Sequence, residues 1–459
     1  MTGKSFDAII IGAGQAGPSL AGRLTAAGQT VAMIERKFFG GTCVNTGCKP
    51  TKTMVASAYA MQMARRAAEY GFSAAGIEAD MKAVKARKDK VTLDSRSGIE
   101  GWLGGMERCT VLRGHAAFLS PHEVSVGGET ISAGKIFVNV GGRANVPPMP
   151  GIDQVSYLTN SSIMDIDFLP GHLVIVGGSY IGLEFAQMYR RFGSRVTVVE
   201  KGPRVIGRED PDISDAIKAI LEDEGIAFRL DAECISFSPR ADGVCVHVDC
   251  ATGDRDVPGT HVLLAIGRVP NTADLGLDKA GVATDEHGYI TVDDELRTSQ
   301  PHIYALGDCN GRGAFTHTAY NDFEIVAANL LDGDSRRLSD RKTAYALYID
   351  PPLGRAGMTE TEARKTGRKI LVGTRQMTQV GRAVERGETK GFMKIVADAD
   401  TRELLGAALL GASGDEVVHG ILDMIYAKAP YTVLQRTVPI HPTVSELLPT
   451  VIADMKPVA

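Results

Sequence analysis

The stretch Ala8-Ile9-Ile10-Ile11-Gly12-Ala13-Gly14-Gln15-Ala16-Gly17 decides the fold of the N-terminal part of this chain. A short apolar run before a glycine turn predicts a strand, and Leu20 and Leu24 then recur at helical spacing. Gly28 ends the helix, and residues 31–34 read as a second strand. The order strand, turn, helix, strand predicts a parallel sheet.

The turn itself has the pattern G-x-G-x-x-G, formed by Gly12, Gly14 and Gly17. The first glycine permits the tight turn, the second lets the backbone approach a pyrophosphate, and the third lets the helix pack against the strand. Free N–H groups at the helix start favour the bound phosphate. Glu35 ends the second strand and is placed to accept a hydrogen bond from a ribose hydroxyl. These features predict a dinucleotide site.

The same order returns about 165 residues later. Residues 172–176 predict a strand, Gly177, Ser179 and Gly182 mark the turn, and Glu200 ends the next strand. Ser179 stands where the fingerprint has its second glycine, so its Cβ is expected to crowd a close pyrophosphate. Two copies of one unit predict two nucleotide-binding domains.

Glu200 bears on which nucleotide the second domain binds. A carboxylate at this position accepts a ribose 2′-OH and repels a 2′-phosphate, so we expect NAD(H) to be preferred over NADP(H). Arg204 and Arg208 follow closely and could instead accommodate a phosphate.

Cys43 and Cys48 stand within Gly-Gly-Thr-Cys-Val-Asn-Thr-Gly-Cys-Lys-Pro-Thr-Lys, residues 40–52. Pro50 suits the first turn of a helix, which predicts that Cys48 lies just before a helix N-terminus, where the dipole lowers the pKa of a thiol. Gly47 gives the loop freedom to bring the sulfurs together. We interpret the pair as a working redox couple. The spacing is not C-x-x-C and no histidine cluster surrounds it, so no metal site is predicted.

The charge, the apolar runs and the other cysteines of the chain limit its possible partners and location. With 50 Lys+Arg against 55 Asp+Glu, the net charge of −5 gives no reason to expect a nucleic-acid partner. No apolar run reaches the roughly 18 residues of a membrane helix, so neither a membrane span nor a targeting segment is expected, and the protein is expected to be cytoplasmic. Cys245 and Cys250 repeat the spacing of the first pair among alternating strand residues, and we interpret them as packing cysteines.

The motifs together resemble the class I pyridine nucleotide–disulfide oxidoreductases, which include dihydrolipoamide dehydrogenase, glutathione reductase and mercuric reductase. The resemblance spans nearly the whole chain and is carried by IIIGAGQAG, GGTCVNTGCKPTK, VIVGGSYIGLEFAQMYRRFGSRVTVVE (174–200), LLAIGRVPNT (263–272), IYALGDCN (303–310) and HPTVSE (441–446). It implies an α/β fold with two Rossmann-like domains, binding FAD and NAD(P), and a C-terminal α+β dimerisation domain. The implied boundaries are 1–148 (FAD), 149–266 (NAD(P)), 267–341 (return to the FAD and central region) and 342–459 (dimerisation).

The resemblance also implies roles for the residues near the redox pair. Cys48 matches the thiol that contacts the flavin, and Cys43 matches the interchange thiol that meets the substrate. Lys52 and Glu184 match an ion pair near flavin N5, which is physically sensible because a buried charge pair tolerates desolvation only as a pair.

His441 and Glu446 match the acid–base dyad of the family. An imidazole has a suitable pKa to take a proton from a substrate thiol and return it, and the carboxylate orients the ring. In the family this dyad serves the flavin of the neighbouring subunit, so the resemblance implies a homodimer with an active site shared between the subunits.

Further positions match cofactor contacts of the family. Tyr180 matches the aromatic gate on the nicotinamide side, and Asp308 matches the acid that bonds the ribityl chain. The complete implied set is Gly12, Gly14, Gly17, Glu35, Gly41, Thr42, Lys52, Ala116, Gly141, Asp308, Thr316 and His317 for FAD, and Gly177, Ser179, Tyr180, Gly182, Glu200 and Gly267 for NAD.

Among the members of the family, the preference for NAD and the His–Glu dyad favour a dihydrolipoamide dehydrogenase, acting on a thiol or disulfide substrate, with a lipoyl group on a carrier protein as one candidate. The C-terminal tail lacks the cysteine pair of mercuric reductases. A reductase of metal ions, quinones or another disulfide is the alternative, because Ser179 and Lys49, between Cys48 and Pro50, depart from the family pattern. A third possibility is a flavin-bound subunit that binds a partner or senses redox state without turnover. The complete set of six catalytic positions argues against it.

Overall fold

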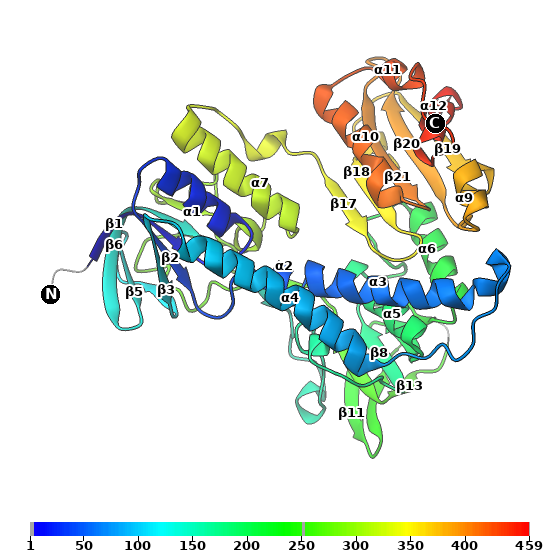
Figure 1. Cartoon of the computed structure of the whole chain (residues 1–459), viewed down its shortest axis with the longest axis horizontal. Helices are drawn as coiled ribbons and strands as arrows, with labels where there is room; N and C mark the ends of the chain where they lie inside the picture. Colours follow the sequence, from blue (N-terminus) through cyan, green and yellow to red (C-terminus); the bar gives the residue numbers. More distant parts are fainter. Residues whose placement is uncertain (1–3, 250–252, 459) are drawn as a thin grey trace.

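The computed structural model describes residues 4–249 and 253–458, which form three sheet-based parts (Figure 1). The mixed α/β fold is confirmed, with the two predicted nucleotide-binding units followed by a C-terminal α+β unit. The prediction for Cys250 lies outside the described residues. The domain boundaries given above stay a prediction.

The first sheet has seven strands, in the order β3-β2-β1-β6-β5-β4 with β16 paired to β6. Its bounds are β1 (Lys4–Ile11), β2 (Val31–Glu35), β3 (Cys109–Arg113), β4 (Ala116–Phe118), β5 (Glu123–Val126), β6 (Glu129–Val138) and β16 (Ile303–Ala305). The pairs among β1, β2, β3, β6 and β16 are parallel, whereas β4 and β5 are joined to β6 as an antiparallel meander. The parallel arrangement follows from the crossover helices.

Two helices cover one face of this sheet: α1 (Ala16–Ala26) and α7 (Thr316–Ala327). Alternate residues of β1 face opposite ways, so Ile10 packs with Leu20 of α1 and Phe323 of α7, whereas Ile9 packs with Phe118 on the other face. The carboxyl end of β1 therefore meets the start of α1 at a rigid, buried edge.

The second sheet repeats this order on a smaller scale. It runs β10-β9-β8-β14 and is entirely parallel. Its bounds are β8 (His172–Val176), β9 (Arg195–Val199), β10 (Ala227–Arg229) and β14 (His261–Leu264), with α5 (Tyr180–Phe192) and α6 (Pro211–Asp223) on one face. Helix α5 begins at Tyr180, so it starts within the predicted turn, before Gly182.

An antiparallel sheet covers the other face of the second sheet. It consists of β11 (Ser236–Arg240), β12 (Gly243–His247) and β13 (Asp256–Gly259). Val244, Val246 and Val257 pack against the buried valines of β8 and β14. The antiparallel pair β7 (Gly142–Ala144) and β15 (Arg268–Pro270) connects the two nucleotide-binding units.

The C-terminal part is a six-stranded sheet in the order β17-β18-β21-β20-β19-β22. Its strands are β17 (Ala344–Leu347), β18 (Leu353–Gly357), β19 (Ile370–Gln376), β20 (Phe392–Asp398), β21 (Leu404–Leu410) and β22 (Lys456–Pro457). Its helices are α8 (Glu360–Lys365), α9 (Gly381–Glu385), α10 (Gly414–Ala427), α11 (Thr432–Gln435) and α12 (Leu448–Ala453). Helix α10 packs on β18 and β21, which gives this part its own core.

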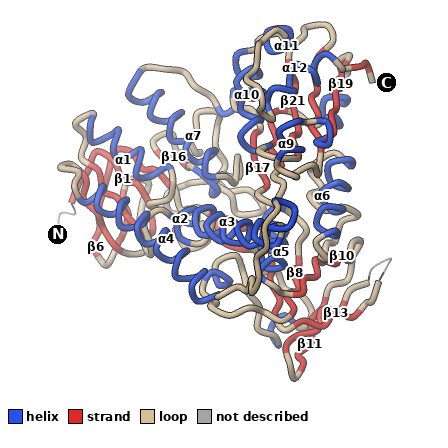
Figure 2. Tube along the Cα trace, turned by 45° about the vertical axis from the view of Figure 1, so that its right-hand side comes forward, coloured by secondary structure: helices blue, strands red, loops and turns tan. Residues whose placement is uncertain are grey.

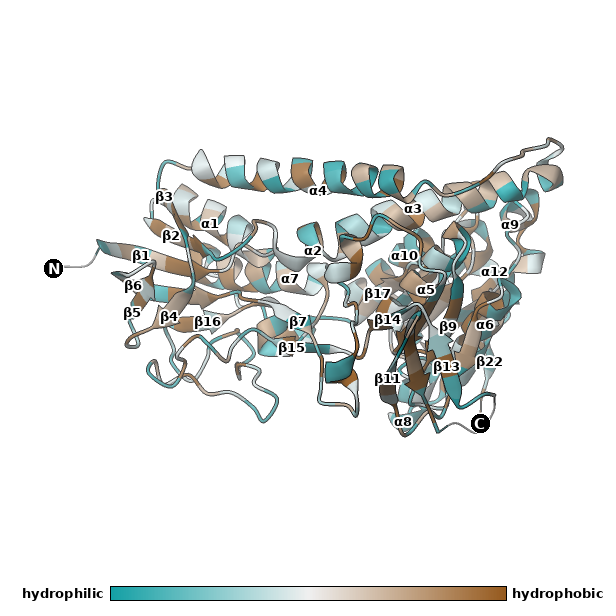
Figure 3. Cartoon of the chain, turned by 90° about the horizontal axis from the view of Figure 1, so that it is seen from below, coloured by the Kyte–Doolittle hydropathy of each residue, from teal (hydrophilic) through white to brown (hydrophobic). Residues whose placement is uncertain are grey.

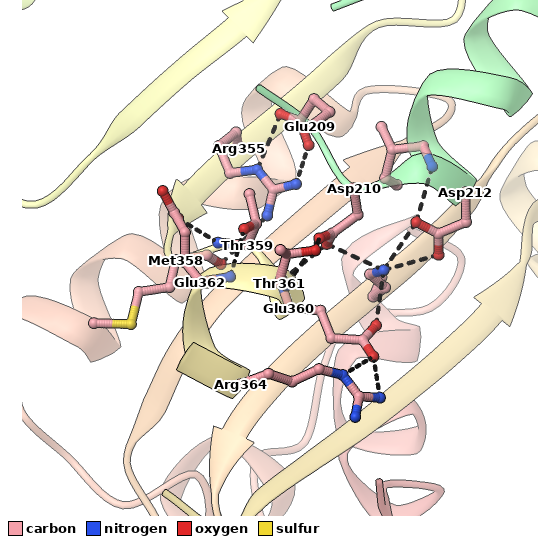
Figure 4. Close-up of polar contacts among 12 residues, drawn as sticks. Glu209, Asp210, Asp212, Arg355, Met358, Thr359, Glu360, Thr361, Glu362 and Arg364 are labelled. Carbon is pink, nitrogen blue, oxygen red and sulfur yellow. Dashed lines mark hydrogen bonds and ion pairs between the residues drawn. The ribbon is translucent and has the colours of Figure 1, made fainter. Parts of the chain in front are cut away.

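A buried polar cluster joins the second nucleotide-binding unit to the C-terminal sheet (Figure 4). Glu209 accepts from the Tyr345 hydroxyl at 2.5 Å and pairs with Arg355, whose side chain is 1% exposed. Asp210 accepts from the backbone N–H groups of Glu360 and Thr361, both at 2.9 Å, at the start of α8. Full pairing is what allows charges to stay buried at this junction.

Two long helices, α3 (Cys48–Arg65) and α4 (Met81–Gly104), pack against each other and run between the sheets (Figure 2). Figure 3 shows α4 along the upper edge of the molecule, with many hydrophilic residues, and the strands of the first sheet below it with many hydrophobic ones. No helix in residues 4–249 and 253–458 is long and apolar enough to cross a bilayer.

Candidate active site

The cysteine pair lies where two helices meet. Cys43 is inside α2 (Gly41–Asn45), and Cys48 is the first residue of α3, after the N-cap residue Gly47. The sequence predicted that Cys48 would precede the helix. The helix starts one residue earlier than expected, because Gly47 separates it from α2 and Pro50 is tolerated in the first turn. A Cβ on Gly47 would lie 2.8 Å from the Thr42 carbonyl oxygen, so only glycine fits between the two cysteines.

The two sulfurs differ strongly in acidity. The pKa of Cys48 is lowered to about 6, chiefly because the Cys43 thiol donates a hydrogen bond to it. The Thr316 hydroxyl, 3.3 Å from the Cys48 sulfur, and the Lys52 charge contribute to this lowering, while burial opposes it. The hydrogen bond between the two cysteines, together with burial, raises the pKa of Cys43. At neutral pH the negative charge therefore rests on Cys48 and the proton on Cys43.

Lys52 and Glu184 form a two-point ion pair beside Cys48. Lys52 Nζ lies 2.8 Å from Glu184 Oε1 and 2.7 Å from Oε2, and the Glu184 side chain is only 5% exposed. Tyr348 supports the pair from the end of β17, since its backbone N–H donates to Glu184 at 3.1 Å and its ring lies 4.6 Å from Lys52 Nζ. The geometry places a held positive charge next to the redox pair.

Lys49, the departure from the family pattern, points away from the couple. It is exposed, and its Nζ donates to Ser95 Oγ on α4 at 2.8 Å. Its charge has a minor lowering effect on the pKa of Cys43.

Aromatic rings gather around Phe315, which precedes Thr316 in the chain. Tyr180, at the start of α5, lies 5.4 Å from Phe315, which also stacks on His317 and Tyr345 at 5.3 and 5.7 Å. His317 bonds the Ala344 carbonyl at 2.8 Å, and burial lowers its pKa. Arg208 lies over the Tyr180 ring at 5.9 Å.

The first glycine turn is a tight backbone crossing. A Cβ on Gly12, which has φ of 105°, would lie 2.3 Å from the Asn139 carbonyl oxygen, and a Cβ on Gly17 would lie 2.4 Å from the Gly12 oxygen. A Cβ on Gly14 would lie 3.3 Å from the side-chain amide nitrogen of Asn139. Glu35 accepts from the Ala13 N–H at 2.9 Å and leaves the helix N-terminus open.

The second turn has the same construction. A Cβ on Gly177 would lie 2.3 Å from the Ala265 oxygen, and a Cβ on Gly182 would lie 2.0 Å from the Gly177 oxygen. Glu200 accepts from Gly178 N–H at 2.6 Å and from Gly202 N–H at 2.8 Å. Ser179 is the N-cap residue of α5, in an extended conformation that directs the chain into the helix.

Other predicted cofactor contacts lie outside the two turns. Asp308 is largely buried, which raises its pKa, and Arg268 Nε opposes this from 3.4 Å. Gly141 and Gly267 have φ of 64° and 100°, and a Cβ on either would meet no atom within 4 Å, so both leave open space there. Ala116 lies in β4.

These features fit FAD. A Cβ on Gly41, which has φ of 60°, would lie 2.9 Å from the Gly14 Cα, so α2 passes close over the first turn, and Thr42 follows in that helix. A glycine cradle at a helix N-terminus suits a diphosphate. The buried Asp308 suits a polyol hydroxyl, which donates a hydrogen bond to it.

His441 and Glu446 form a pair in the C-terminal part, with His441 Nδ1 2.9 Å from Glu446 Oε2. The His441 side chain is 80% exposed, and the neighbouring Val438 and Ile440 are 96% and 79% exposed. The pair lies between α11 and α12, whereas the cysteines lie at α2 and α3, in different parts of the molecule (Figure 1). Exposed apolar side chains beside a charged pair are typical of an interface.

The structure thus brings together Cys43, Cys48, Lys52, Glu184 and Thr316 within one chain and keeps the His441–Glu446 pair apart from them. Sequence reasoning missed three supporting residues: Tyr348, Phe315 and Arg268. Arg268 and Phe315 are next to predicted positions, whereas Tyr348 carries no local signal.

Two family models cover the chain. Residues 6–322 match the pyridine nucleotide-disulphide oxidoreductase model, and residues 343–452 match the dimerisation domain of the same family. The chain belongs to the pyridine nucleotide-disulphide oxidoreductases. Members of this FAD-dependent oxidoreductase family use a pyridine nucleotide, and the dimerisation domain supports a homodimer.

Relatives of this oxidoreductase match it along its whole length. It is 37% identical over 453 residues to the probable pyridine nucleotide-disulfide oxidoreductase RclA of Escherichia coli strain K12, covering 97% of this chain and 98% of that protein. It is 32% identical to the dihydrolipoyl dehydrogenase of Thermus scotoductus, covering 96% of each. Among solved structures, the Cu(II) complex of HOCl-induced flavoprotein disulfide reductase RclA from Escherichia coli matches with a TM-score of 0.90 and 36% identity, over 98% of this chain and 99% of that one.

Proposed function

We propose that this oxidoreductase moves electrons between NAD(H) and a substrate through the Cys43–Cys48 couple, with Cu(II) as the preferred oxidant. The observation that carries the proposal is the acidity of Cys48, whose pKa of about 6 keeps a thiolate beside Cys43 at neutral pH. When bound, FAD supplies two-electron transfer between the nicotinamide and this couple.

Different residues of the chain hold the cofactor and stabilise the Cys48 thiolate. Gly12, Gly14 and Gly17 would hold the diphosphate of FAD, and Asp308 its ribityl chain. Lys52, held by Glu184, keeps a positive charge beside the Cys48 thiolate. The Thr316 hydroxyl orients the Cys48 sulfur.

Cys43 is the substrate-facing thiol in this proposal. Oxidation of the Cys43 thiol and the Cys48 thiolate forms one S–S bond and releases two electrons and one proton, so two Cu(II) ions each accept one electron. Support for copper comes from the related RclA structure, which is described as a Cu(II) complex. A thiol is also a soft ligand, which suits copper as it becomes Cu(I).

Oxidation of dihydrolipoamide is the second candidate, and the His441–Glu446 contact favours it. Because the proton rests on Cys43 and on the substrate thiol, dithiol chemistry needs a base, and an imidazole held by a carboxylate supplies one. The pair would serve the second copy of the chain, since it lies on the exposed side of the dimerisation domain. A lipoyl carrier as partner belongs to this candidate only.

The nucleotide preference is part of the proposal. Glu200 accepts from two backbone N–H groups at the second glycine turn, while Arg204 pairs with Asp215 at 3.2 Å and Arg208 lies over Tyr180. Both arginines are therefore engaged elsewhere, which supports NAD(H). The free cysteines among the described residues support a reducing compartment, so we also propose a cytoplasmic location.

A substrate panel tests this function. Purified enzyme is assayed with NADH or NADPH against Cu²⁺, Hg²⁺, glutathione disulfide, lipoamide and a quinone. The proposal expects the highest kcat/KM with NADH and Cu²⁺, loss of this turnover in Cys43→Ser, and continued bleaching of the flavin by NADH in that variant. A higher rate with lipoamide, lowered by roughly 10²–10⁴-fold in His441→Gln, would establish the second candidate instead. Failure of NADH to bleach the flavin would refute both.

A further inference from the structure

The outer face of the antiparallel sheet carries three metal-binding side chains that the mechanism does not use. Cys245 and His247 are two residues apart on β12, so they point to the same face, and the register places Asp256 of β13 opposite His247. Val244, Val246 and Val257 face the core on the opposite side. Sheet geometry, not proximity in sequence, brings the three together.

The ligand atoms are close to the separations that an ion needs. His247 Nδ1 lies 2.7 Å from Asp256 Oδ1 and 3.9 Å from Cys245 Sγ, and the three atoms all lie within 4.8 Å of one another. Tetrahedral Zn²⁺ with bonds of about 2.0 Å to nitrogen and oxygen and about 2.3 Å to sulfur places its ligand atoms about 3.3–3.5 Å apart. The two separations from His247 Nδ1 therefore need to change by about half an ångström, and the separation of Cys245 Sγ from the Asp256 oxygen by at most about 1.3 Å.

A fourth residue orients the imidazole. Ser238 of β11 lies 2.8 Å from His247 Nε2, on the far side of the ring from Asp256. A hydroxyl can donate or accept, so it satisfies Nε2 in either tautomer. With Nε2–H donating to Ser238, the Nδ1 lone pair faces Cys245 and Asp256, which is how partners of metal-bound histidines act.

We propose that Cys245, His247 and Asp256 bind one Zn²⁺ ion on this face, with water in the fourth position. On binding, the Cys245 thiol releases its proton to solvent, and the neutral imidazole shifts its proton from Nδ1 to Nε2. One thiolate and one carboxylate balance the charge of the ion. The set of thiolate, imidazole and carboxylate matches the ligands that zinc takes.

The contacts Ser238–His247–Asp256 also have the order of a hydrolytic triad. Cys245 distinguishes a metal site from a hydrolytic triad, because its sulfur approaches the same His247 Nδ1 atom as the Asp256 carboxylate. A triad has no use for a thiol there, whereas a metal gains a third ligand. The site lies on the sheet at the lower end of the molecule, opposite the C-terminal sheet (Figure 1).

Zinc uptake by the oxidised holoenzyme tests the site, because Cys43 and Cys48 are then a disulfide and offer no thiol. Equilibrium dialysis against buffered Zn²⁺ is expected to show one ion per chain. Asp256→Asn and His247→Gln are expected to weaken binding at least tenfold, and Ser238→Ala by roughly 10–100-fold. Cys234→Ser, which changes an exposed cysteine of the same unit, is the matched control and is expected to bind normally.

Cobalt identifies the sulfur ligand. Co²⁺ is expected to give the intense long-wavelength bands of a tetrahedral site, beyond the absorption of the oxidised flavin, and Cys245→Ser is expected to remove them. Because Cys245 is buried, its variant is accepted only if it retains the flavin, and the exposed Asp256 provides a test that does not disturb the core. Unchanged uptake in Asp256→Asn, or unchanged cobalt bands in a flavin-loaded Cys245→Ser, would overturn the proposal.

Discussion

Lys52 and Glu184, which lie 132 residues apart on α3 and α5, meet in a two-point ion pair at 2.7 and 2.8 Å beside the Cys48 sulfur. The two charges act on Cys48 with opposite signs, since Lys52 lowers its pKa and Glu184 raises it. Glu184 therefore fixes the position of Lys52 and also limits how far Lys52 lowers the pKa of Cys48.

Neutralising either member is expected to move the pKa of Cys48 in opposite directions. Lys52→Met raises it from about 6, and Glu184→Gln lowers it. The pKa of Cys48 in each variant is measured from the long-wavelength absorbance of the reduced, dithiol form of the enzyme as a function of pH. Lys52→Met is also expected to cost on the order of 2 kcal/mol of unfolding free energy, because the buried Glu184 loses its counter-ion. Shifts of the same sign in the two variants would contradict this arrangement.

The Thr316 hydroxyl is expected to hold the Cys48 thiolate. Thr316→Val removes this hydrogen bond, worth roughly 1 kcal/mol, so the pKa of Cys48 is expected to rise from about 6 to about 7. Thr316→Ser retains the hydroxyl and is expected to restore the wild-type titration. If serine and valine gave the same curve, the hydroxyl would have no such role.

Glu35 and Glu200 end equivalent strands and accept from equivalent backbone groups, Ala13 N–H and Gly178 N–H. They are expected to serve different nucleotides. Glu200→Gln is expected to lower the ratio of kcat/KM for NADH to that for NADPH by about tenfold, equivalent to about 1.4 kcal/mol, without loss of flavin. Glu35→Gln is expected to weaken FAD retention and leave the ratio unchanged. Measurements of flavin content and steady-state kinetics distinguish the two variants. Loss of flavin in Glu200→Gln together with a changed nucleotide ratio in Glu35→Gln would exchange the two assignments.

The buried pair Glu209–Arg355 is expected to secure the junction between the second nucleotide-binding unit and the C-terminal sheet. Glu209→Gln leaves the Arg355 charge buried without its counter-ion, which is expected to cost about 3–5 kcal/mol of unfolding free energy. Asp223→Asn breaks the exposed pair with Lys390, also at this junction, and is expected to change little. Denaturant titration of both variants at one FAD concentration measures the two losses of unfolding free energy. Equal losses would show that burial does not determine how much the Glu209–Arg355 pair stabilises the junction.

The sequence by itself determined the local units of this protein. Both strand–turn–helix units, the acids that end the second strands and the cysteine pair lie within about 35 residues of their own partners, so spacing and residue type suffice to predict them. The family followed from the same motifs and was confirmed. Even so, the exact start of α3 depended on how Gly47 packs against the preceding turn.

Only the tertiary structure decided which distant groups meet. The contact of Cys48 with Thr316 spans 268 residues, and the ion pair of Lys52 with Glu184, which the family resemblance implied but no spacing predicts, spans 132. Packing of helices and registration of strands set such contacts, and no short-range pattern encodes them. Cys245 illustrates the same point. The alternating strand residues around it predict a packing cysteine, and it is buried, but only the register of β12 and β13 places its sulfur beside His247 and Asp256.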